Sequence, residues 1–301
     1  MTGWVAWGGS VAGMVTGVTS SMVQAWELGL RLRERREQLG LTATVVGKTT
    51  RIGGTNLSAI EGGKRRLTAT KLTDLAGAYE LSADELAELD TIRARAEQRE
   101  WYHDYTTLHS EEFLRFLGLE AGAASARSYQ AELIPGLLQT ADYARATFKG
   151  GSPYIRPVDV GPRLESRLAR QTRLGGENPL RLSVVIHQAA LLQEVGNPAV
   201  MAHQLEHLAT VIDGNHDHVE VRIMPFTAGA HPLIGYPMTI LSFDSPRLPD
   251  LLWQETISSQ ALIDRRDTLR EYAASFDEAM DRALTREDSL ALIHHTRKET
   301  T

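Results

Sequence analysis

The chain has 301 residues, enough for two domains of ordinary size, and its 42% apolar and 23% charged residues are typical of a soluble globular protein. It contains no cysteine, which excludes disulfide bonds, thiolate catalysis and cysteine-ligated zinc, and which suits a reducing cytoplasm. The net charge of −6 argues against nucleic-acid binding only if the charge is evenly spread.

The charge is unevenly distributed along the chain. Residues 27–82 contain ten Lys and Arg against six Asp and Glu, whereas residues 83–301 contain 22 against 32. A basic module joined to an acidic body is the asymmetry expected when only one part of a protein meets phosphate.

Residues 1–26 have no charged side chain, and glycine and threonine interrupt their apolar residues. They lack the basic start of a secretory signal and the roughly 20 continuous apolar residues of a membrane span. We therefore expect a disordered tail, or translation from a start upstream of the true one at Met14 or Met22. An anchor for a membrane or a partner is the alternative.

Periodic apolar residues predict short helices in the basic module. The expected ranges are 27–39, 42–49, about 55–61 and about 70–80. The positions expected to face the core are Leu28, Leu32, Leu39, Val45, Val46, Leu57, Ile60, Leu72, Leu75, Ala76 and Tyr79. Gly40 ends the first helix and Thr42 caps the second, while the Ser82 to Glu85 capping box begins a further helix that continues to about residue 100.

The remainder of the chain mixes helices and strands. Helices are expected at 111–121, 137–148, 158–174, about 198–213, about 260–284 and after Thr285. A strand is expected at 180–187, where apolar residues alternate, and further strands are expected at 219–226, 238–243 and 250–255. We therefore expect a helical domain with its connector at 27–100, and an α+β domain at 101–301 that binds an effector or a partner.

The order of elements in the basic module resembles the Xre-type helix-turn-helix domain. The resemblance lies in Leu32-Arg33, in Gly40-Leu41-Thr42 and in the run from Leu57 to Gly63 (Leu-Ser-Ala-Ile-Glu-Gly-Gly). It implies a multi-domain protein: an all-α five-helix domain that binds double-stranded DNA, followed by a larger α+β domain. Three residues depart from the pattern: Gly53 and Gly54 stand where such domains often have Ser-Gln, and Ala59 stands where they often have a long polar or basic residue.

A major groove about 12 Å wide admits one helix, which neighbouring helices hold against the backbone. On the third helix Asn56 suits adenine and Thr55 suits a thymine methyl group. The basic side chains on either side of the helix suit phosphate. The residues expected to contact DNA are Lys48, Arg51, Thr55, Asn56, Ser58, Lys64, Arg65 and Arg66.

The second part of the chain is similar to the C-terminal domain of actinobacterial Xre-type regulators of the WhiJ-like, toxin–antitoxin-like group. The matching stretches are Leu133–Ala146, Arg167–Gln171, Ile186–Leu192, Val221–Phe226 and Trp253–Glu255. This similarity implies a transcription regulator, often encoded beside a small partner protein that it binds, with no known ligand and no catalysis. Gln188 departs from it, because an acidic residue usually stands there.

His203, Glu206 and His207 match the H-x-x-E-H pattern of a zinc hydrolase. Both histidines lie almost opposite the apolar stripe of their expected helix, where a packed helix meets water. No third ligand is evident, and a hydrolytic zinc needs a concave, partly dry site. A zinc hydrolase is therefore the less favoured alternative.

The sequence thus predicts a cytoplasmic DNA-binding transcription regulator that is not an enzyme, holds no cofactor and contacts no membrane. We expect it to act as a homodimer, and its second domain to receive a small partner protein or a small-molecule signal. The alternative is an antitoxin-like protein-interaction module in which DNA contact is secondary.

Overall fold

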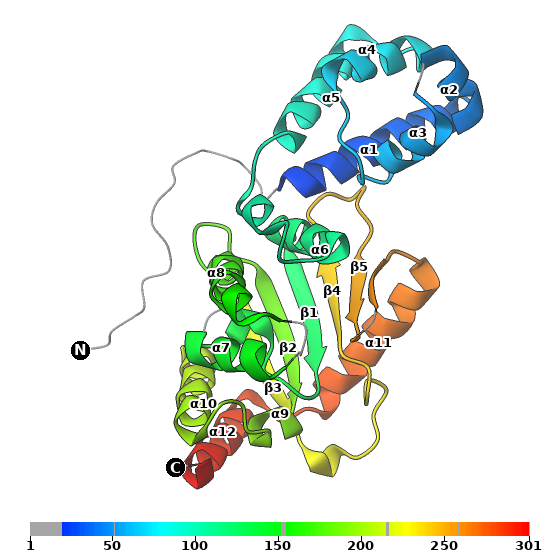
Figure 1. Ribbon diagram of the computed structural model, residues 1–301. Coiled ribbons are helices and arrows are strands. Elements are labelled where there is room, and N and C mark those ends of the chain that lie inside the picture. The colour runs from blue at the N-terminus through cyan, green and yellow to red at the C-terminus, as the bar shows by residue number, and fades with distance from the viewer. Residues whose placement is uncertain (1–19, 51, 152–154, 215–216, 258, 301) are drawn as a thin grey trace.

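The computed structural model describes residues 20–50, 52–151, 155–214, 217–257 and 259–300. A helical domain precedes a larger α+β domain, and Figure 1 shows the two stacked end to end. The helices of the first domain are α1 (Ser21–Gln38), α2 (Ala43–Thr50), α3 (Gly54–Glu61), α4 (Ala69–Ala78) and α5 (Ala83–Ala96).

The core of the first domain is formed mainly by the apolar residues that the periodicity selected. Leu32, Leu57 and Leu75 have no exposed surface. The capping box at Ser82 is present, with both of its hydrogen bonds to Glu85. The expectation that Val45 faces the core is wrong, because 46% of its surface is exposed. Of the two valines, only Val46 is buried. Successive side chains of an α-helix point about 100° apart, so Val45 turns away from the core when Val46 faces it.

The first helix begins earlier than the expected residue 27. Helix α1 begins at Ser21, and the Ser20 side chain caps it by accepting a hydrogen bond from the Val23 amide. Val23 and Trp26 are buried in the core of the larger domain, whereas Leu28 and Leu32 belong to the core of the first. One helix thus contributes to both cores, and the rest of the expected tail, residues 1–19, lies outside the described residues.

The larger domain is built on a six-stranded sheet with the order β3-β2-β1-β4-β5-β6. The strands are β1 (Ser125–Gln130), β2 (Arg181–His187), β3 (Val219–Met224), β4 (Met238–Ser242), β5 (Leu251–Glu255) and β6 (Gln260–Ile263). Strands β1, β2 and β3 pair in parallel, and the β1–β4, β4–β5 and β5–β6 pairs are antiparallel.

Helices cover both faces of this sheet (Figure 1). The helices are α6 (Glu111–Ala121), α7 (Ala141–Gly150), α8 (Val160–Gln171), α9 (Ala189–Leu192), α10 (Pro198–Asp213), α11 (Arg266–Arg282) and α12 (Arg286–Thr300). Helices α6, α7, α10 and α12 share a core with the face that carries Leu182 and Val184. Helix α11 packs through Leu269 and Phe276 on the opposite face.

The structure adds two strands to those expected. Strand β1 occupies a stretch in which we expected mainly helices, and β6 occupies the start of the helix expected from residue 260. Neither strand has the alternating apolar pattern that identifies a strand in a sequence. In β1, Ser128 and Gln130 lie on a face whose neighbours in β2 are apolar. The other expected strands are confirmed, with ends that differ by one or two residues.

Candidate nucleic-acid interface

Helix α3 lies against α1 at a point where two glycines permit close approach. A Cβ atom at Gly29 would collide with the carbonyl oxygens of Ile60 and Glu61. Gly63, directly after α3, has a φ of 65°, and its Cβ would lie 2.6 Å from the Cα of Trp26. Such backbone contacts admit only glycine, so they determine how deeply α3 sits in the domain.

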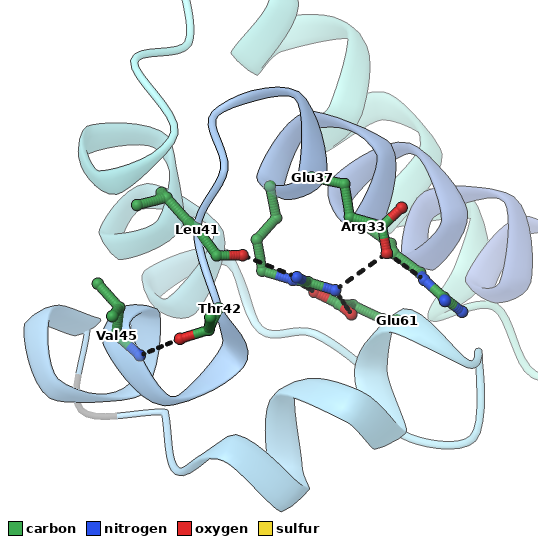
Figure 2. Close-up of polar contacts among 7 residues, drawn as sticks. Arg33, Glu37, Leu41, Thr42, Val45 and Glu61 are labelled. Atoms are coloured by element: carbon green, nitrogen blue, oxygen red, sulfur yellow. Dashed lines mark hydrogen bonds and ion pairs between the residues drawn. The ribbon is translucent and has the colours of Figure 1, made fainter.

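Arg36 of α1 binds the C-terminal end of α3. Its Nε and Nη2 donate to the two carboxylate oxygens of Glu61 at 2.6 and 2.9 Å, and its Nη1 donates to the carbonyl oxygen of Leu41 at 2.9 Å. Figure 2 shows these contacts beside the exposed pair of Arg33 and Glu37. The bond to Glu61 raises the pKa of Arg36. Glu61 is buried, and the positive charge of Arg36 offsets its negative charge at close range.

The opposite face of α3 is open to solvent. Thr55 and Ser58 are exposed, and Asn56 is partly exposed. The Oδ1 atom of Asn56 accepts a hydrogen bond from Nη1 of Arg65 at 3.1 Å. The turn after α3 thus supplies a cation beside the side chain expected to contact bases.

The segment around α2 and α3 is strongly basic. Residues 38–73 contain six Lys and Arg and one acidic residue, which is Glu61. Lys48 on α2 and Lys64 after α3 are both exposed, one on each side of α3 along the chain. The excess of positive charge around α2 and α3 is therefore larger than the excess over residues 27–82 as a whole. Such a segment is suited to contact with a phosphate backbone.

Two of the predicted DNA contacts need separate comment. Arg66 is exposed, but its Nη2 lies 3.0 Å from Nε2 of His103 and its Nη1 donates to the Glu97 carbonyl oxygen at 3.4 Å. It therefore ties the basic turn, residues 62–66, to the connector after α5. Arg51 lies outside the described residues.

The basic turn also rests on the larger domain. Arg115 of α6 donates from Nη2 to the carbonyl oxygen of Gly62 at 3.0 Å. An exposed ion pair at 2.7 Å joins Arg247, between β4 and β5, to Glu34 of α1. Sequence reasoning missed these contacts, because a single arginine in a helix or loop carries no signal of its distant partner.

Comparison with known families agrees with this division. Residues 27–89 match a helix-turn-helix domain, and residues 113–295 match a domain of unknown function, DUF5753. The second match covers more than half of the chain. The chain belongs to the DUF5753 family. No curated protein and no solved structure matches it.

The zinc pattern lies within the DUF5753 domain, on α10. His203 is exposed and His207 is partly buried, and burial lowers the pKa of His207, with a smaller contribution from His203. Glu206 forms an ion pair with Arg297 of α12, which occupies the carboxylate expected to act as a base. Within the described residues, no group of three or more His, Asp or Glu side chains is arranged to hold a metal ion.

Among the helices that the structure describes, none is long and apolar enough to span a bilayer.

Proposed function

We propose that this protein is a cytoplasmic transcription regulator that binds double-stranded DNA through α3 and through the three cations of the basic turn, Lys64, Arg65 and Arg66. The single observation that carries the proposal is the exposed polar face of α3, with Thr55 and Ser58, beside a turn of consecutive cations. Helix α3 enters the major groove, Asn56 contacts a base edge, and the cations contact phosphate.

The proposal includes a homodimer, because a two-fold assembly doubles the number of contacts with a palindromic site. The DUF5753 domain then receives the signal, as the resemblance to Xre-type regulators of the WhiJ-like group implies. No observation on the described residues favours an antitoxin-like module, so DNA is proposed as the principal partner. Copurification with a small protein and no shift of any duplex would contradict this choice.

The basic turn is tested by removing two charges together. The double variant Lys64→Ala and Arg65→Ala is expected to bind every duplex more weakly. The slope of log Kd against log salt should fall by about two, since each lost phosphate contact removes roughly 0.9. Fluorescence anisotropy across a salt series measures both quantities.

The control removes two exposed cations of the larger domain, Arg145 and Arg181. Its overall charge change is the same, so only the position of the charges differs. Equal salt slopes for the two double variants would show that the basic turn does not contact phosphate.

Asn56 is tested by sequence preference rather than by affinity alone. A preferred duplex is first selected from a random library with the unmodified chain. Asn56→Ala should then lose about 1–3 kcal/mol on that duplex and much less on an unrelated one. Equal losses on both duplexes would remove Asn56 from the residues proposed to contact bases.

A further inference from the structure

A cavity of about 250 Å³ lies in the larger domain, between the sheet, α6, α8 and the segment 133–139. One buried water needs only roughly 10–15 Å³ of such space. The cavity therefore has room for a small organic molecule. Polar side chains form its floor, and aromatic rings and an arginine form its walls.

The floor of the cavity is polar. Ser128 of β1 and Thr239 of β4 are cross-strand partners, are both buried, and have hydroxyl oxygens 3.0 Å apart. The Nε2 atom of Gln130 donates to the Ser128 hydroxyl at 3.1 Å. Buried hydroxyl and amide groups cost free energy unless they are hydrogen-bonded, and a cavity beside them gives a ligand access to the same groups.

One wall is aromatic. The rings of Phe116 and Trp253 stack with centroids 4.6 Å apart and an interplanar angle of 19°. Phe113 adds a third ring, 6.0 Å from Trp253. This flat apolar surface suits a planar apolar group.

The other wall carries an arginine with no counter-ion. Nη1 of Arg167 donates to Oε1 of Gln139 at 2.6 Å, and its guanidinium lies 4.9 Å from the ring centroid of Phe148. No ion pair to Arg167 exists among the residues that the structure describes. Burial, reinforced by the charge of Arg170, lowers the pKa of Arg167 to about 10.

The neighbouring arginine shows what Arg167 lacks. Arg170, one turn later on α8, donates from Nε and Nη2 to the two carboxylate oxygens of Glu120 at 2.5 and 2.6 Å. Both carboxylate oxygens of Glu120 are therefore hydrogen-bonded to Arg170. Glu255, at the end of β5, lines the cavity but is exposed to solvent. Among the described residues no carboxylate therefore lies within ion-pair distance of Arg167, although the charge of Glu255 acts on it from farther away.

We propose that this cavity binds a small organic anion. Its carboxylate accepts hydrogen bonds from the guanidinium of Arg167, and its apolar part lies against Phe113, Phe116 and Trp253. A carboxylate matches the planar fork of a guanidinium and supplies the missing negative charge. This inference deepens the proposed function, because it names the class of signal, and its effect on DNA binding rests on that function.

Helix α6 connects the cavity to the DNA-binding domain. Phe113 and Phe116 face the cavity, whereas Arg115 donates to the Gly62 carbonyl oxygen, and the Gly118 carbonyl oxygen accepts from the Ser20 hydroxyl. A ligand that moves the aromatic wall therefore moves the helix on which the basic turn rests. The structure gives a direct route of contacts from the cavity to α3.

The binding test uses the full chain and three probes: phenylacetate, its neutral analogue phenylacetamide, and inorganic phosphate. Isothermal titration calorimetry should show phenylacetate binding at least tenfold more tightly than phenylacetamide or phosphate. Arg167→Gln should remove the preference for phenylacetate over phenylacetamide. The control, Arg181→Gln, loses the same charge from an exposed position outside the cavity and should retain it.

A second variant tests the same guanidinium independently, in case Arg167→Gln does not fold. A Cβ atom at Gly136 would lie 2.8 Å from Nη1 of Arg167, so Gly136→Ala displaces the guanidinium without changing any charge. It should weaken phenylacetate binding as well. Equal affinity for the acid and the amide, unchanged affinity in both variants, or no binding of any probe would each overturn the proposal. Phosphate binding as tight as phenylacetate would also overturn it, since the aromatic wall would then have no role.

The same samples separate this inference from the proposed function. Saturating phenylacetate should change the Kd for a duplex at least threefold, and Arg167→Gln should abolish the change. A chain that binds duplex DNA but none of the probes contradicts the anion site alone. A chain that binds phenylacetate but no duplex contradicts the proposed function alone.

Discussion

Arg115 and Gly62 join the two domains at the end of the DNA-binding helix. The Nη2 atom of Arg115 lies 3.0 Å from the carbonyl oxygen of Gly62, which is the C-cap of α3. The C-terminal end of a helix carries partial negative charge, so a guanidinium is favourable there. Arg115 is partly buried at this junction, and this burial lowers its pKa.

Removal of this guanidinium should loosen the junction. We expect Arg115→Met to be less stable than the unmodified chain by about 1.5–3 kcal/mol, the usual contribution of a charged hydrogen bond. Trypsin should then cleave faster after exposed Arg99, in the segment between the domains. Urea unfolding and a digestion time course measure the two effects. Arg145→Met, at an exposed position on α7, is the control, and an unchanged cleavage rate in Arg115→Met would contradict the expectation.

The pair of Arg36 and Glu61 should be important for the stability of the first domain. Side-chain exposure is 12% for Arg36 and 6% for Glu61, so Arg36→Gln leaves a buried carboxylate without its partner. We expect a loss of about 3 kcal/mol in the free energy of unfolding. Urea unfolding followed by circular dichroism measures it.

Arg33→Gln is the matched control for that variant. Arg33 and Glu37 form a similar pair on the same helix, but their side chains are 57% and 53% exposed. Exposed pairs contribute little, so this variant should unfold close to the unmodified chain. Comparable losses in the two variants would mean that burial does not distinguish the pairs.

Two glycines should respond in opposite directions to alanine. Gly63→Ala places a Cβ 2.6 Å from the Cα of Trp26 at a φ of 65°, so we expect a loss of at least about 2 kcal/mol. Gly77 lies in α4 with nothing within 4 Å of its Cβ position. Gly77→Ala should therefore stabilise the protein by about 0.5–1 kcal/mol. Thermal unfolding gives both signs, and a neutral Gly63→Ala would exclude the close approach to α1.

His109 should make the protein less stable as the pH falls. Its Nε2 lies 3.0 Å from the Ser166 hydroxyl, and burial together with Arg163, Arg167 and Arg170 lowers its pKa to about 4. The unfolded chain binds the proton near pH 6.5, so the contribution to stability is fully present above pH 6.5 and is lost as the pH falls towards 4.

The test compares His109→Gln with the unmodified chain by urea unfolding between pH 7 and pH 4. The loss of stability over this range should be smaller in the variant, since the protonation that favours unfolding is gone. His203→Gln, at an exposed position on α10, should follow the unmodified chain. Parallel curves for all three proteins would show that His109 is not held neutral in the folded state.

Several elements were predictable from local signals. The capping box at Ser82 and the spacing of Leu57 and Ile60 depend on residues within one or two turns, and the structure confirms both. Strand β1 was not predictable in this way. It carries Ser128 and Gln130 because its covered face lines a cavity, and the apolar alternation that identifies a strand is therefore missing.

The sequence by itself determined the class of the protein: a basic helical module with turn and cap residues at the required spacing, and an acidic α+β body. Only the tertiary structure decided that the start of α1 belongs to the core of the larger domain, and that Arg170 has a carboxylate partner whereas Arg167 has none among the described residues. The reason is physical. Caps and periodicity are properties of neighbouring residues, whereas burial and pairing depend on which distant surfaces meet.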